Sequence, residues 1–134
     1  IGLSQGGAKT ITFSESVHNP LIALVSWNGN SVDFAAGSNL QYLSWGCGYW
    51  GCGSFANTTS THFDGSGELH GVIELLGDFT SISFTDTSEG WHGLTVGVVG
   101  LTPPPDGVPE PWSLSLIGLS LAGLALLRRR PAGS

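Results

Sequence analysis

An apolar segment near the end of the chain limits what this sequence can fold into. Residues 112–127 contain no charged side chain, and Arg128, Arg129 and Arg130 follow at once. As a helix the segment is about 24 Å long, somewhat less than the ~30 Å hydrocarbon core of a bilayer. Trp112 lies where an interfacial aromatic side chain is expected, and arginines on one side alone place the C-terminus in the cytoplasm. We therefore predict a single transmembrane helix, with everything upstream outside.

A short motif comes directly before this helix: Pro109, Glu110 and Pro111. The order of Pro-Glu-Pro, short apolar helix and arginine cluster resembles the PEP-CTERM sorting signal of Gram-negative bacteria. The resemblance implies export, transient anchoring in the inner membrane, processing near the motif by an exosortase-type enzyme, and release to the cell surface or matrix. Two other interpretations are a plain single-pass anchor and a buried core helix, although the segment has no amphipathic stripe.

The sequence divides into three parts. Residues 1–101 are enough for one domain with its own core. Residues 102–107 include three consecutive prolines, which predict a semi-rigid spacer because they cannot join a central strand. Residues 108–134 form the predicted sorting signal. The chain contains no methionine, so we expect that residue 1 is not a translation start.

Residues 1–101 have the pattern of an all-β domain. Residues 10–13 alternate polar and apolar side chains, and residues 21–27 form an apolar run typical of a central, doubly covered strand. Asn28-Gly29 is a strong two-residue turn signal, which predicts a hairpin over residues 21–35. In residues 79–84 the alternation points Phe79, Ile82 and Phe84 toward a core and Ser81 and Ser83 toward solvent.

Parts of this domain resemble the short β-sandwich domains that often precede PEP-CTERM signals. The likeness lies in residues 10–20, 77–84 and 91–98. It implies an antiparallel, jelly-roll-like β-sandwich and an exported location, and it implies no ligand. The edge strands of such a fold offer a route to self-association.

The charge balance excludes nucleic acid as a partner. Lys9 is the only basic residue before the Pro-Glu-Pro motif, where nine acidic residues occur. Nucleic-acid binding needs a basic surface to neutralise phosphates. The balance favours solubility and is compatible with cation binding.

The two cysteines, Cys47 and Cys52, lie in a glycine-rich loop that also contains Tyr49 and Trp50. In an oxidising compartment we predict that they form a disulfide, which closes a small ring and holds both aromatic side chains exposed. Free thiols and metal ligation are the alternatives. A thioredoxin-type role is disfavoured because four residues, not two, separate the cysteines.

Metal and catalytic motifs are weak in this sequence. The spacing of the four histidines matches no zinc signature, so we predict surface or strand-edge positions for His18, His62, His70 and His92. Asp86 and Glu89 could ligate calcium, but a polar turn is the simpler interpretation. Candidate hydrolase residues lack any local nucleophile motif; they are Ser44, Glu68, Glu74, His70 and His92. We predict no enzymatic activity, no metal and no cofactor.

Exposed aromatic side chains are the remaining candidates for a binding site. Sugars dock on aromatic faces beside polar groups, and five tryptophans occur in the chain. The candidates for glycan contact are Trp45, Tyr49, Trp50 and Trp91, with Trp27 as a weaker one. Our first hypothesis is an exported, non-enzymatic surface or matrix protein that acts in assembly or adhesion. The alternative is a lectin-like module that binds carbohydrate such as exopolysaccharide.

Overall fold

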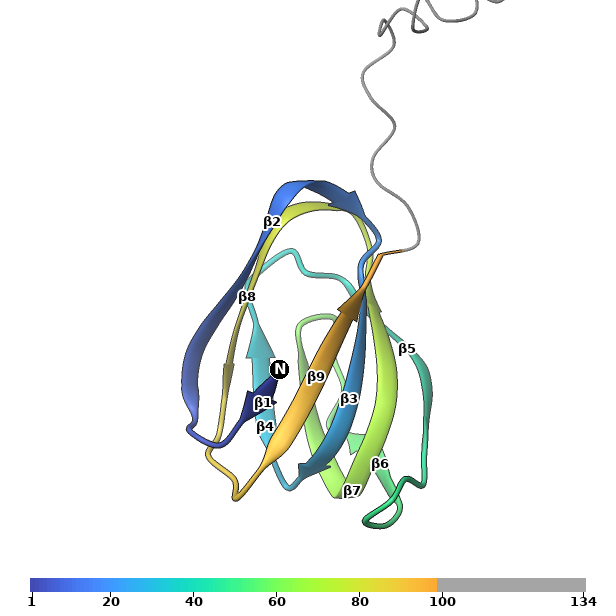
Figure 1. Cartoon of the computed structure of the whole chain (residues 1–134). Coiled ribbons are helices and arrows are strands. Elements are labelled where there is room, and N and C mark those ends of the chain that lie inside the picture. The colour runs from blue at the N-terminus through green and yellow to red at the C-terminus, as the bar shows by residue number, and fades with distance from the viewer. Residues whose placement is uncertain (99–134) are drawn as a thin grey trace, which may run out of the picture. The chain divides into compact units, whose positions relative to one another are not determined.

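The computed structural model describes residues 1–98, which form antiparallel β-strands and no helix (Figure 1). The strands are β1 (Gly2–Leu3), β2 (Gly7–His18), β3 (Leu21–Asn28), β4 (Ser31–Phe34), β5 (Leu40–Gly46), β6 (Gly53–Ala56), β7 (His62–Leu75), β8 (Asp78–Asp86) and β9 (His92–Gly97). The all-β prediction is confirmed for these residues. The predicted spacer, the sorting signal with its helix, and residues 99–101 lie outside the described residues.

Strand β7 connects the two halves of the sheet. Its C-terminal half pairs with β3 on one side and β5 on the other, and its N-terminal half pairs with β4 and β6. Beyond β3 the sheet continues through β9 to β1, and beyond β4 it continues through β8 to β2. The sheet therefore curls into two facing layers in a sandwich-like arrangement (Figure 1). We call the layer with β1, β9, β3 and β5 the first layer, and the layer with β2, β8, β4 and β6 the second.

The predicted hairpin over residues 21–35 is wrong. Strand β3 pairs with residues 68–74 of β7, and β4 pairs with residues 62–64 of the same strand. The two strands therefore follow one another along β7 instead of pairing with each other. Asn28-Gly29 forms a bend, not a reversal, and the φ of Gly29 is 75°, which glycine adopts without strain.

Five segments cross between the layers at one end of the domain, the lower end in Figure 1, which we call the crossover end. They are residues 4–6, 29–30, 47–52, 65–67 and 87–91. Buried Asn30 ties three of them together, because its side-chain amide donates to the Thr87 carbonyl at 2.9 Å and its main-chain carbonyl accepts from the Gly65 N–H at 2.8 Å. The crossings are thus held in fixed positions relative to one another.

An aromatic core lies between the layers. Trp27 is 1% exposed, its ring lies 6.0 Å from that of Phe63 and 6.5 Å from that of Phe84, and its N–H donates to the Gly93 carbonyl at 2.7 Å. Aliphatic side chains complete the core: Ile22, Leu24, Val32, Leu40, Leu69, Ile73, Leu75, Ile82 and Leu94. Burial of such side chains provides the main stabilisation of the fold. Trp27 therefore belongs to the core, and its assignment as a glycan contact is wrong.

The predicted facing of β8 is largely confirmed. Ile82 and Phe84 are buried, and Phe79 packs against the core. Ser81 is exposed, whereas Ser83 is half-buried, with its hydroxyl 2.9 Å from that of Thr10 on β2.

Candidate functional site

The disulfide loop presents two aromatic side chains at the crossover end. Cys47 and Cys52 are joined by a disulfide, which confirms the predicted pairing. Between them the Gly48 N–H donates to the Gly51 carbonyl at 2.7 Å, closing a tight turn. Tyr49 is 91% exposed and Trp50 is 55% exposed. The ring therefore holds both side chains out of the core.

A third aromatic side chain joins them from a distant part of the chain. Trp91 lies just before β9, and its ring is 5.4 Å from that of Trp50, at an interplanar angle of 53°. Tyr49 meets Trp50 edge to face at 5.3 Å, and on β7 the ring of His70 is parallel to Trp50, 6.4 Å away between centroids. We call Tyr49, Trp50 and Trp91 the aromatic surface. Adjacent residues of a strand point to opposite faces, so His70 points outward because its neighbour Leu69 points into the core. Trp50 stacks on His70, and the aromatic surface therefore lies on the outer side of the first layer.

Bare glycine backbone supports these rings. A Cβ on Gly48 would lie 2.5 Å from the imidazole of His70. Cβ atoms on Gly2 and Gly93 would lie 3.1 and 3.2 Å from the indole of Trp91. Because these positions carry no side chain, Trp91 and His70 lie close against the backbone and keep their orientation.

Trp45, the remaining predicted glycan contact, lies elsewhere. It is 57% exposed, but its ring packs edge to face on Phe55 at 6.0 Å, and Phe55 contacts the core residue Phe63. Trp45 pairs across the sheet with Gly71, whereas its neighbour Gly46 pairs with His70. Since adjacent strand residues point to opposite faces, Trp45 points away from the side that carries His70. Three of the four predicted contacts thus come together, and Trp45 does not.

Two carboxylates, those of Glu68 and Glu89, accept hydrogen bonds from Asn28, and we call them the acidic pair. The main-chain N–H of Asn28 donates to Glu89 at 3.2 Å, and its side-chain amide donates to Glu68 at 2.9 Å. Glu68 packs next to the disulfide loop, since a Cβ on Gly51 would lie 3.0 Å from its Cγ. Glu89 is two residues before Trp91. The sequence does not reveal this pair, because the two residues are far apart in the chain and come together only in the folded sheet.

Glu68 is held from a second side by strained backbone. Ser26, in a bulge of β3, has a φ of 57° and is buried, and its hydroxyl donates to Glu68 at 2.6 Å. A non-glycine residue in this conformation is unfavourable and persists only where its surroundings enforce it. Here the strain directs the hydroxyl at Glu68, so the position of this carboxylate is built into the fold.

The environment of Glu89 shifts its proton affinity. Partial burial raises the pKa of its carboxyl above the ordinary value, and the hydrogen bond from Asn28 and the nearby imidazole of His92 oppose the rise. The negative charge of Glu68 makes a smaller contribution in the raising direction. Because the folded state then binds this proton more tightly than the unfolded chain, the resulting stabilisation is present at low pH. It is lost as the pH rises through the folded pKa.

Comparisons with known proteins do not assign this site. No family model, curated protein or solved structure matches the chain. Its function is therefore inferred from the geometry of its own side chains. Among residues 1–98, no helix is long and apolar enough to cross a bilayer.

A buried polar cluster lies at the same end of the domain. Asp86 and His92 have fully buried side chains, with 2.9 Å between the carboxylate Oδ2 and the imidazole Nε2. Lys9 forms a salt bridge with the other oxygen of Asp86 and also donates to the Gln5 carbonyl at 2.8 Å. His92 Nδ1 is buried without a hydrogen-bond partner, 3.5 Å from Glu89. The prediction that all four histidines lie at the surface or strand edges is therefore wrong for His92.

This cluster also removes the calcium alternative at the turn after β8. Both carboxylate oxygens of Asp86 already bond to Lys9 and His92, so they are not directed at a common site with Glu89. In the part of the chain that the structure describes, no group of three or more His, Cys, Asp or Glu side chains is arranged to hold a metal. His18 instead pairs with Asp78, and the imidazole of His62 lies between Asp33 and Asp64.

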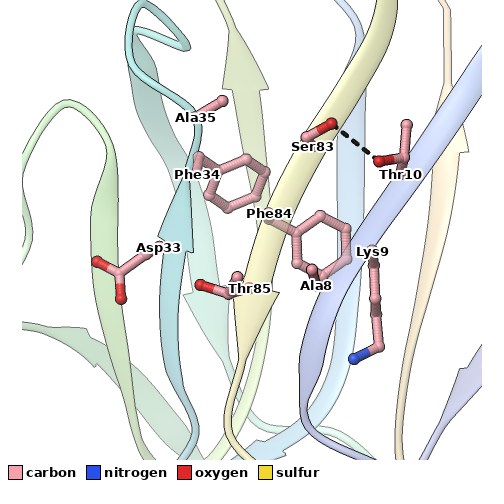
Figure 2. A pocket seen from close by; sticks show the side chains of 9 residues that line it. All are labelled: Ala8, Lys9, Thr10, Asp33, Phe34, Ala35, Ser83, Phe84 and Thr85. Atoms are coloured by element: carbon pink, nitrogen blue, oxygen red, sulfur yellow. Dashed lines mark hydrogen bonds between the residues drawn. The ribbon is translucent and has the colours of Figure 1, made fainter.

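A separate groove of about 460 Å³ crosses β8 (Figure 2). Phe34 and Phe84, with ring centroids 5.3 Å apart, form its apolar floor, and Lys9 and Asp33 stand on opposite sides. Both charged groups already have partners, because Lys9 binds Asp86 and Asp33 lies 2.8 Å from His62. The groove is therefore a weaker candidate than the aromatic surface.

Proposed function

We propose that residues 1–98 form a carbohydrate-binding domain that uses the aromatic surface. The observation that supports this proposal is the contact between Trp50 and Trp91, two exposed indoles from loops far apart in the sequence. Exposed large aromatic side chains that gather in one place mark interaction sites. The disulfide and the glycine backbone fix the rings in advance, so little conformational entropy is lost on binding.

The chemistry of the surface suits sugars. The C–H face of a pyranose ring is apolar and packs on the face of an indole, whose π-system is electron-rich. The sugar hydroxyls need hydrogen-bond partners at the edge, and Glu68, Glu89 and Asn28 provide them. Apolar faces and polar groups thus lie side by side, as a lectin-like site requires.

The test is the loss of binding in Trp50→Ala. With a panel of neutral and amino-sugar polysaccharides in affinity electrophoresis, we expect binding to weaken roughly tenfold or more, because central aromatic anchors dominate such interfaces. Trp45→Ala is the matched control, since the two indoles are exposed to a similar degree, 57% and 55%. An equal effect of both substitutions, or no binding to any polysaccharide, would contradict the proposal.

We further propose the setting in which the domain acts. On this proposal the chain is an exported, non-enzymatic surface or matrix protein: a jelly-roll-like sandwich held outside the inner membrane by the spacer and the helix of residues 112–127. Its partners are an exosortase-type enzyme, the membrane and exopolysaccharide, with self-association through edge strands as a second route to assembly. The support is the sorting motif and the arginine cluster in the sequence.

Sorting has its own test. Replacing Pro109, Glu110 and Pro111 with alanine is expected to leave export intact and to abolish maturation, because the extended, proline-held segment that the enzyme recognises is lost. The measurement is the intact mass of the membrane-bound and secreted protein. A secreted product of unchanged mass would contradict the assignment of these residues as the processing signal.

A further inference from the structure

We propose that the aromatic surface selects saccharides that carry a protonated amine, such as chains of glucosamine. This inference rests on the proposed function and specifies its ligand class. It follows from the position of the acidic pair: Glu68 packs against Gly51 of the disulfide loop, and Glu89 is two residues from Trp91. A sugar seated on the two indoles therefore has Glu68 beside it, and Glu89 is near because Asn28 donates to both carboxylates.

No lysine or arginine among residues 1–98 reaches these carboxylates. Lys9 is the only lysine or arginine among residues 1–98, and it is bound to Asp86. The groups that approach the acidic pair are the Ser26 hydroxyl, the two nitrogens of Asn28 and the buried imidazole of His92, 3.5 Å from Glu89. Within the described residues, neither carboxylate forms a salt bridge with lysine or arginine. A ligand that brings its own positive charge would complete the arrangement.

The two carboxylates are also close enough to affect each other. The charge of Glu68 contributes to the raised pKa of Glu89, and Asn28 holds both side chains at once. Two like charges kept together, with Ser26 in strained backbone aimed at one of them, are unfavourable in the free protein. An ammonium group bound between them relieves this repulsion, and a neutral group does not.

An ammonium group gains two kinds of interaction here. It donates charge-assisted hydrogen bonds to the carboxylates, and it is attracted to the faces of Trp50 and Trp91. An N-acetylated sugar has a neutral amide in the same place, so it lacks both the charge-assisted hydrogen bonds and the attraction of a cation to the indole faces. A uronic acid places a third negative charge beside the acidic pair and is repelled. The expected order of affinity is amine, then acetamide, then carboxylate.

The experiment compares glucosamine hexamer with N-acetylglucosamine hexamer by isothermal titration calorimetry. At low salt and a pH at which the sugar amine is protonated, we expect the amine to bind roughly tenfold more tightly. Raising the salt concentration should narrow this ratio. Equal affinity for the two hexamers would overturn the amine preference and leave the proposed carbohydrate function standing. No binding of either hexamer, together with none across the polysaccharide panel, would overturn both proposals.

Variants that remove a carboxylate charge test whether the acidic pair causes the amine preference. Glu68→Gln combined with Glu89→Gln should remove most of the amine preference and leave only the part that the indole faces contribute. Glu89→Gln alone, which leaves the Ser26 contact intact, should reduce the amine-to-acetamide ratio by about threefold. Glu15→Gln is the matched control, because it removes one charge from an exposed site on β2. If Glu15→Gln lowers the ratio as much as Glu89→Gln, net charge and not the acidic pair determines selectivity, and the inference fails.

Discussion

Gly65→Ala is expected to destabilise the domain by at least about 3 kcal/mol. A Cβ on Gly65 would lie 2.1 Å from the carbonyl oxygen of Trp27 and 3.0 Å from its carbonyl carbon. Both atoms belong to the backbone, so no side-chain rotation relieves the clash. The Gly65 N–H also donates to the Asn30 carbonyl at 2.8 Å, so the strand cannot move away without breaking this bond. Urea unfolding followed by tryptophan fluorescence measures the loss.

Gly46→Ala is the control for this substitution. Gly46 is also a strand residue, but a Cβ there meets nothing within 4 Å. Alanine is expected to be neutral or slightly stabilising, because glycine in a strand is less favourable than alanine by roughly 0.5–1 kcal/mol. Similar stabilities for the two variants would show that β3 and β7 do not cross as closely at the crossover end as the structure has them.

The strands could be predicted because their patterns are local. The apolar run of residues 21–27 correctly predicted a central strand, since β3 lies between β7 and β9. The strand is not fully covered on both faces, because Leu21, Ala23 and Val25 are only half-buried. The same run ends in Trp27, so the sequence already held the information that this tryptophan belongs to the core. The position of Trp27 at the end of an apolar strand, and not its residue type, determines its burial.

The path of the chain at the crossover end could not be predicted. Asn28-Gly29 favours a reversal only if the following strand finds its partner in β3, and here β4 finds it in β7 and β8 instead. Competition between partners distant in the sequence decides such a bend, and a dipeptide carries no information about it. The close approach at Gly65 is equally invisible, since it depends on where Trp27 lies.

The candidate site was predictable in part. The spacing of Cys47 and Cys52 was enough to predict an exposed Tyr49-Trp50 tip, because a short disulfide ring has few conformations. The approach of Trp91 depends on the loop between β8 and β9, which no local pattern fixes. The types of side chain at the site could be read from the sequence. Which of them lie next to one another depends on how the sheet curls.

The buried cluster at the crossover end gives the second large expected effect. Lys9→Met leaves the fully buried carboxylate of Asp86 with the imidazole of His92 as its remaining side-chain partner. Removing one partner of a buried ion pair costs about 3–5 kcal/mol, and because Lys9 is 19% exposed we expect roughly 3 kcal/mol. Thermal and urea unfolding measure this loss. Lys9, the only lysine among residues 1–98, is thus a structural residue, a role that no local pattern predicts.

A double-mutant cycle separates this pair from the other bonds of Lys9, which also donates to backbone carbonyls of Gln5 and Gly7. Asp86→Asn alone also destabilises, but with Lys9→Met it should destabilise by at least about 1 kcal/mol less than the sum, because no charge is left unpaired. Asp78→Asn, at the solvent-exposed pair with His18, should have little effect. Strict additivity of the two substitutions would mean that Lys9 stabilises the domain through its backbone contacts and not through Asp86.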